Sequence, residues 1–164
     1  MNPNLREVVL PGGGRANVRL RLTHEQDTVL EAATLDYWDA LPDDVLASIQ
    51  DRESASTDDV KKVAKRTRGY GAVTRATDAM MTAQILACVA DWDGVRDPDG
   101  NDLAWPAGLS GLASADFAAL HEGCLAAVAA GRADPNAGAG PSEKPSTPED
   151  PTPDGPQPSA KPGG

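Results

Sequence analysis

The sequence predicts a mainly α-helical domain, fronted by an N-terminal β-hairpin and followed by a disordered Pro-rich C-terminal tail. Three observations lead to this fold class: a strand-like alternation near the N-terminus, apolar stripes at helical spacing from residue 23 onwards, and a C-terminal segment without large apolar side chains. Apolar residues at every second position are typical of a half-buried strand, and those at every third or fourth position are typical of a helix. We therefore expect a folded domain over residues 5–132 and a tail over residues 133–164.

Two short strands are predicted at residues 5–10 and 15–22, joined by Pro11 and three glycines. The second strand alternates between an apolar face and a polar, basic face: Ala16, Val18, Leu20 and Leu22 against Arg15, Asn17, Arg19 and Arg21. A Pro-Gly segment between two such runs indicates a tight turn, and hence a β-hairpin. The glycines do not fit a phosphate-binding loop, because no Gly-Lys-Ser/Thr follows and no helix begins directly after them.

The first helices are placed by their N-terminal caps and by proline. Thr23 and Gln26 have the spacing of a capping box, in which each side chain bonds to the backbone of the other residue. The helix that follows has an apolar face with residues at intervals of four: Val29, Ala33, Tyr37 and Leu41. Pro42 ends this helix, Asp43 favours the start of a second one, and Thr57 is the predicted cap of a short third helix.

The strongest helical signal covers residues 73–91, in which residues 85–90 are all apolar. A helix that is apolar around most of its girth is usually central in a small domain. Residues 97–100, Asp-Pro-Asp-Gly, then indicate a type I turn, because proline stands second and glycine fourth. Ser114 is the predicted cap of the last helix and Gly131 its predicted stop. The residues of this helix expected to face inward are Phe117, Leu120, Cys124, Leu125 and Val128.

The tail and the net charge limit the kinds of partner. The tail holds nine of the fourteen prolines and no Val, Ile, Leu, Met, Phe, Trp or Tyr, so burial there cannot offset the loss of chain entropy. The whole chain has 15 basic and 25 acidic residues, which gives a net charge of −10. This sign disfavours nucleic acid as a partner, because phosphate backbones are also negative. No apolar stretch is long enough for a membrane span or a signal peptide, so we expect a cytoplasmic protein without a membrane partner.

Five aspartates between residues 91 and 102 raise the question of a calcium site. An EF-hand loop needs an oxygen ligand at its first position and glycine at its sixth. With Gly100 at the sixth position the first is Val95, and with Gly94 at the sixth position the first is Val89. Neither valine has a side-chain oxygen, so we expect a solvated turn in which the aspartates bend the backbone.

Other chemical sites are weakly supported by the sequence. Four side chains of the zinc-binding types are present: Cys88, Cys124, His24 and His121. None is paired at the short spacing that zinc sites use, so the cysteines are expected to act as small core residues and His121 as a boundary residue. No serine lies in a Gly-x-Ser-x-Gly elbow. We expect no metal, no cofactor and no enzymatic activity; a small hydrolase or metal-dependent enzyme that uses Ser110 or the 91–102 loop is the alternative.

Four aromatic residues are candidates for partner binding: Tyr37, Trp38, Trp92 and Trp105. Tyr37 and Trp38 are adjacent, so on a helix they point about 100° apart and do not share a narrow stripe. Trp92 and Trp105 lie on either side of the predicted turn. A tryptophan exposed beside a loop is a common interface anchor, and the alternative is that all four belong to the core or its edge.

Residues 79–128 contain a small-residue helix followed by Trp92-Asp93-Gly94-Val95, then Asp99-Gly100, then Leu103 and Pro106. With this pattern the stretch resembles the tail assembly chaperones of long-tailed (siphovirus-type) bacteriophages and prophages, of the actinobacterial type. The opening Leu-Pro-Gly-Gly-Gly of residues 10–14 is also similar to small tail-region proteins of these phages. Ala104 and Trp105 separate Leu103 from Pro106, whereas the family has a direct Leu-Pro pair.

This resemblance implies a non-catalytic tail assembly chaperone that acts in the host cytoplasm. Proteins of that family bind the tape measure protein, keep it soluble and help to recruit tail tube subunits, and many have a longer form made by ribosomal frameshifting. Its implied partners are therefore the tape measure protein, the tail tube protein and a second copy of the chain. Partner contacts are assigned to the aromatic residues and the family motif: Tyr37, Trp38, Trp92, Asp93, Gly94, Asp99, Gly100 and Trp105. A structural head–tail connector or minor tail protein of the virion is the alternative.

Overall fold

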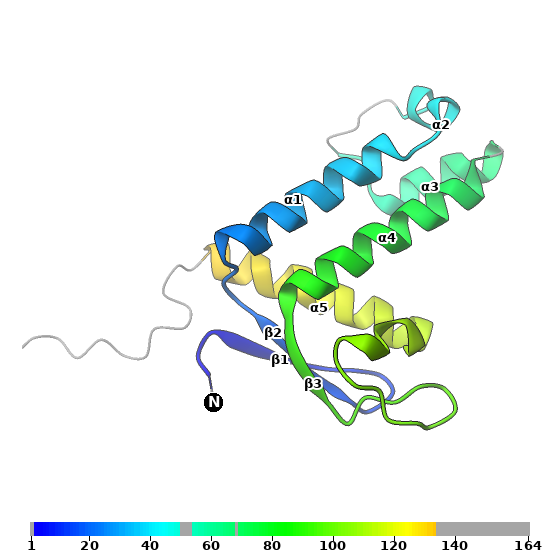
Figure 1. Ribbon diagram of the computed structural model, residues 1–164. Helices are drawn as coiled ribbons and strands as arrows, with labels where there is room; N and C mark the ends of the chain where they lie inside the picture. Colours follow the sequence, from blue (N-terminus) through cyan, green and yellow to red (C-terminus); the bar gives the residue numbers. More distant parts are fainter. Residues whose placement is uncertain (1, 50–53, 68, 134–164) are drawn as a thin grey trace, which may run out of the picture.

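The computed structural model describes residues 2–49, 54–67 and 69–133 (Figure 1). Nearly all of the predicted tail lies outside the described residues. The predicted mainly α-helical class is confirmed, and the elements follow in this order: β1 (Leu5–Val9), β2 (Arg15–Arg19), α1 (His24–Asp39), α2 (Asp43–Ala47), α3 (Thr57–Arg66), α4 (Tyr70–Cys88), β3 (Val89–Asp93), the 3-10 helix η1 (Ala107–Gly111) and α5 (Ser114–Ala133). In this part of the chain, no helix has both the length and the apolar character that a membrane span requires.

The predicted β-hairpin is confirmed. Strands β1 and β2 pair antiparallel, with Val8 opposite Ala16, and the turn between them passes through Gly13 at a φ of 94°. Ala16 and Val18 are fully buried, as the alternation predicts, and face α5. The arginines of β2 lie on the other face of the sheet, which no described element covers.

A third strand corrects the prediction that one helix covers residues 73–91. Helix α4 ends at Cys88, and β3 pairs antiparallel with β2, with Trp92 opposite Ala16, which gives a sheet of order β1-β2-β3. A short run of apolar residues fits a buried helix and a buried strand equally well, so periodicity did not separate the two. Arg19 stabilises the change of structure, because its Nη1 donates to the carbonyls of Ala87 (3.3 Å) and Val89 (2.5 Å).

The capping box at the start of α1 is confirmed. The Thr23 hydroxyl accepts from the Gln26 backbone N–H at 3.3 Å, and the Thr23 N–H donates to the Gln26 side chain at 2.9 Å. The predicted apolar face is wrong at Val29, which is 41% exposed, while Leu30 is buried instead. The buried stripe of α1 therefore runs at intervals of three and four, as a helix of 3.6 residues per turn requires: Leu30, Ala33 and Tyr37.

Two other helices begin earlier than predicted. The cap of α3 is Ser56 rather than Thr57, because the Ser56 hydroxyl accepts from the Asp59 N–H at 3.2 Å and the Asp59 carboxylate bonds back to Ser56. Helix α4 begins at Tyr70, three residues before the predicted start. The segment Gly69-Tyr70-Gly71 therefore does not interrupt the helix. Gly69 is the N-cap of α4 and is buried close to Val45.

The last helix also differs from its prediction. Ser114 is the first residue of α5 rather than its cap, and Leu125, predicted to face inward, is 44% exposed. Gly131, the predicted stop, lies inside the helix and is buried. A Cβ atom on Gly131 would overlap the carbonyl oxygen of Leu20, so this glycine allows α5 to approach the end of β2 closely.

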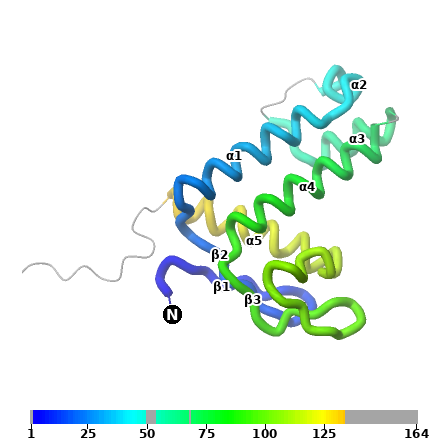
Figure 2. The backbone as a smooth tube through the Cα atoms, viewed as in Figure 1, coloured from blue at the N-terminus to red at the C-terminus, as the bar shows by residue number. Residues whose placement is uncertain are grey.

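The buried residues form two clusters that α4 connects. The first lies between the sheet, α5 and the end of α4; among its members are Ala16, Val18, Ile85, Leu120 and Cys124. The second lies between α1, α2, α3 and the start of α4; among its members are Tyr37, Val45, Val60, Val73 and Met80. Figure 2 shows α1 and α4 side by side, with α2 and α3 at the end away from the sheet.

Candidate functional site

Two of the predicted aromatic residues come together. Trp92 on β3 and Trp105 in the following loop pack edge to face, with ring centroids 4.9 Å apart and an interplanar angle of 68°. The indole N–H of Trp92 donates to the carbonyl of Leu103 at 2.7 Å. Both rings are half-buried against the first core cluster. Their contacts close the base of the loop over residues 93–105, so at least part of each ring has a structural role.

The predicted turn over residues 97–100 is confirmed within this loop. The Gly100 N–H donates to the Asp97 carbonyl at 3.0 Å, with Gly100 at a φ of 87°. The Asp97 carboxylate also accepts from the backbone N–H groups of Asp99 and Asn101, at 2.9 and 2.8 Å. Hydrogen bonds from the Asn101 side chain and backbone hold the pKa of the Asp97 carboxyl below its usual value. Asp93, Gly94, Asp99 and Gly100 are exposed around this turn.

The other two aromatic residues lie elsewhere. Tyr37 is 4% exposed and Trp38 is half-buried, and both belong to the second core cluster. Their rings pack edge to face with centroids 5.4 Å apart. Burial raises the pKa of the Tyr37 phenol, and the nearby Thr77 hydroxyl partly offsets the shift. The structure therefore does not join Tyr37 and Trp38 to the tryptophan pair, and Tyr37 is buried in the core.

An open groove that the sequence did not indicate runs between α4, η1 and the start of α5. It consists of two adjoining hollows of about 440 and 260 Å³. Four residues line both hollows, which makes them one continuous feature: Thr82, Leu109, Ser110 and Phe117. We call this feature the α4–η1–α5 groove. It lies where the two core clusters meet, because its walls come from both parts of α4.

The α4–η1–α5 groove is mainly apolar in its smaller hollow, while its larger hollow combines apolar, polar and charged side chains. Leu86, which lines the smaller hollow, is 46% exposed, and Met81 and Phe117 are half-buried in the larger one. Lys61 of α3 and Asp78 of α4 line the larger hollow, and neither forms an ion pair with any residue that the structure describes. An exposed apolar surface with unpaired charges at its edge is typical of a site for another protein.

Ser110, the residue of the alternative enzymatic hypothesis, lies in this groove and is exposed. Its hydroxyl makes no hydrogen bond to a histidine or carboxylate of residues 2–49, 54–67 and 69–133. His121 is occupied between helices, since its Nε2 lies 2.6 Å from Oε1 of the buried Gln84. The Gln84 amide in turn donates to the Thr34 hydroxyl at 3.5 Å. Burial lowers the pKa of His121, which matches the boundary position predicted for it.

Cys88 and Cys124 are both fully buried in the first core cluster. They lie on α4 and α5, and their thiols interact across the interface between these helices. The hydrogen bond between them, together with burial, raises the pKa of the Cys124 thiol. The same hydrogen bond lowers the pKa of Cys88. Within the described ranges no three metal-ligating side chains gather at one point.

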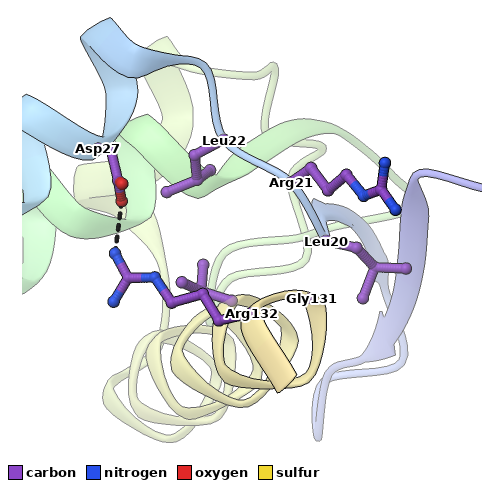
Figure 3. A pocket seen from close by; sticks show the side chains of 7 residues that line it. Leu20, Arg21, Leu22, Asp27, Gly131 and Arg132 are labelled. Carbon is purple, nitrogen blue, oxygen red and sulfur yellow. Dashed lines mark hydrogen bonds and ion pairs between the residues drawn. The ribbon is translucent and has the colours of Figure 1, made fainter. Parts of the chain in front are cut away.

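A separate hollow of about 390 Å³ lies beside the end of α5 (Figure 3). Leu20, Leu22 and Val128 line it, and an ion pair crosses its rim, with Arg132 Nη2 2.5 Å from Asp27 Oδ1. Both of these side chains are largely exposed, and such pairs contribute little to stability. We assign this hollow to the packing of α5 against the connection between β2 and α1.

Comparison with protein-family models, with curated proteins and with solved structures finds no match to this chain. We therefore infer a function from the geometry of the α4–η1–α5 groove. Sequence reasoning missed this groove because Lys61, Asp78 and Ser110 come from three separate elements. The one sequence signal for the groove is Leu86. It belongs to the apolar run over residues 85–90, but its side chain is exposed.

Proposed function

We propose that this protein is a non-catalytic tail assembly chaperone of a long-tailed phage or prophage. In this role it binds the tape measure protein in the host cytoplasm, keeps it soluble and helps to recruit tail tube subunits. The observation that carries the proposal is the α4–η1–α5 groove, an apolar surface that remains open on a small acidic domain. The resemblance of residues 79–128 to this family supports the same conclusion.

The physical basis of the activity is the temporary burial of apolar side chains. Apolar segments of an unassembled partner associate with one another because water excludes them. In the groove such a segment can pack against Leu86, Met81 and Phe117 and does not need to associate with another partner molecule. The net charge of −10 then keeps the complexes apart and soluble.

The proposal moves the main partner contact away from the residues assigned by sequence. Tyr37 is buried, so it is no longer included. The exposed loop residues stay a predicted secondary contact: Asp93, Gly94, Asp99 and Gly100. The exposed parts of three half-buried residues are included with them: Trp38, Trp92 and Trp105.

Co-expression with the tape measure protein of the same phage or prophage tests the proposal. We expect the wild-type chain to increase the soluble fraction of the tape measure protein several-fold. The substitution Leu86→Glu places a charge in the groove and should abolish most of this increase. Leu125→Glu is the matched control, because Leu125 is also on a helix and is 44% exposed against 46% for Leu86, but does not line the groove.

Two results would contradict the proposal. The first is a soluble fraction that does not change whether the chain is present or absent. The second is an equal effect of the two glutamate substitutions, which would show that the groove is not the surface that keeps the tape measure protein soluble. Mass spectrometry of purified particles adds an independent readout: a chaperone should be scarce in the virion, whereas a connector or minor tail protein should be present in a fixed copy number.

A further inference from the structure

Lys61 marks one end of the α4–η1–α5 groove. It is half-buried on α3, and it is the one Lys or Arg among the described residues that line the groove. No described carboxylate lies within ion-pair distance of its ammonium group. Its neighbour Lys62 differs in both respects: it does not line the groove, and it pairs with Asp59 at 3.4 Å.

The walls of the groove limit the backbone structure of an occupant. They are formed by α4, η1 and α5, whose backbone N–H and C=O groups bond mainly within their own helices. An extended strand in the groove would leave its own backbone groups without partners on the apolar side. A helix satisfies these groups internally and presents only side chains. Apolar side chains at positions i, i+3 or i+4, and i+7 would then follow the groove.

We propose that the α4–η1–α5 groove binds an amphipathic helix of the partner, and that a carboxylate near one end of that helix pairs with Lys61. This inference rests on the proposed function and names the part of the tape measure protein that is bound. The apolar stripe of the helix lies over Leu86 and Phe117, and its acidic end lies at α3.

The unpaired charges at this end favour an occupant with one residue of each sign, so that a carboxylate faces Lys61. Helix α3 itself adds little net charge here, because its first turn is acidic, with Asp58 and Asp59, and its last turn is basic, with Lys65 and Arg66. Asp78 lies in the same hollow and is also unpaired among the described side chains. Asp78 would repel a second carboxylate beside the first and would attract a basic side chain. We therefore expect the bound helix to carry one acidic residue at this end, with a basic residue near it.

Peptides of 25 residues that tile the tape measure protein of the same phage or prophage, labelled for fluorescence anisotropy, test this inference with the full-length chain. We expect the tightest peptides to have an apolar stripe of helical period and to become helical on binding, as measured by circular dichroism. Lys61→Glu should weaken their binding about tenfold, a loss of about 1.4 kcal/mol. Lys62→Glu, the same charge reversal outside the groove, should change it less than twofold.

A charge exchange completes the experiment. Replacing the acidic residue of the best peptide by lysine should weaken its binding to the wild-type chain and restore binding to the Lys61→Glu variant. Urea denaturation of each variant shows whether it is folded. Equal effects of the Lys61 and Lys62 substitutions would overturn the pairing, and peptides that bind without becoming helical would overturn the helix. Either result leaves the proposed function standing if the wild-type chain still keeps the intact tape measure protein soluble.

Discussion

Gly131 of α5 lies directly against the carbonyl group of Leu20, at the end of the hairpin. Replacement by alanine would place a Cβ atom on the Leu20 oxygen, which is a backbone atom and cannot rotate away. We expect Gly131→Ala to lower the free energy of unfolding by about 3 kcal/mol, at the upper end of the usual range for overpacking. Urea denaturation followed by circular dichroism measures this change.

Gly71 of α4 is the control for this substitution. A Cβ atom there would meet only the end of the Arg75 side chain, at 3.6 Å, which is an ordinary contact. Because alanine is favoured over glycine in a helix by up to about 1 kcal/mol, Gly71→Ala should leave stability unchanged or raise it. Similar losses in both variants would show that the contact with Leu20 is not what makes position 131 intolerant.

The buried carboxylate of Asp116 ties the start of α5 to the hairpin turn. It is 4% exposed, and its Oδ1 accepts from the Gly12 N–H at 2.7 Å. Asp116→Ala would leave this N–H without its acceptor, so we expect a loss of about 1–3 kcal/mol in the free energy of unfolding. Asp116→Asn keeps an acceptor oxygen and should lose less. An alanine variant as stable as the wild type in urea would contradict the assigned role.

The elements found from the sequence are those set by local pattern. The capping box of Thr23, the hairpin alternation and the 97–100 turn all depend on residues close together in the chain, and each is confirmed. The end of α4 was missed because it depends on a distant partner. Residues 89–93 form a strand where β2 offers an unpaired edge and where Arg19 binds the carbonyls of Ala87 in the helix and Val89 in the strand.

The candidate site was harder to predict for the same reason. The tryptophans were correctly placed on either side of a turn, but their mutual contact and the bond to Leu103 depend on how the loop folds back. The burial of Tyr37 was left open by the sequence because it depends on α4, which packs beside this residue. The groove joins Lys61 to Ser110 across almost fifty residues of sequence, and no spacing in the chain indicates such a contact.

The hydrogen bond between His121 and Gln84 predicts a pH dependence of stability. Burial lowers the pKa of His121 in the folded protein, so the unfolded chain binds a proton more readily. The contribution of neutral His121 is complete above the unfolded pKa of about 6.5 and is lost as the pH falls from there towards the folded pKa. Urea denaturation at pH 7.5, 6.5 and 5.5 should therefore show a steeper decline for the wild type than for His121→Gln. Carboxylates affect both proteins alike, and parallel curves would contradict the prediction.

The contact between Cys88 and Cys124 predicts two unreactive thiols. Both side chains are fully buried, and burial together with the hydrogen bond to Cys88 raises the pKa of Cys124. Because a reagent cannot reach either sulfur while the two helices are packed together, reaction with an aromatic disulfide reagent requires the helices to open first. We expect the native protein to react at least about a hundredfold more slowly than the protein in denaturing urea, where both thiols should titrate. Fast reaction of either cysteine in buffer would show that α4 and α5 separate readily. The slow reaction predicted here would allow a cysteine introduced at the exposed Leu125 position to be labelled selectively for the binding measurements.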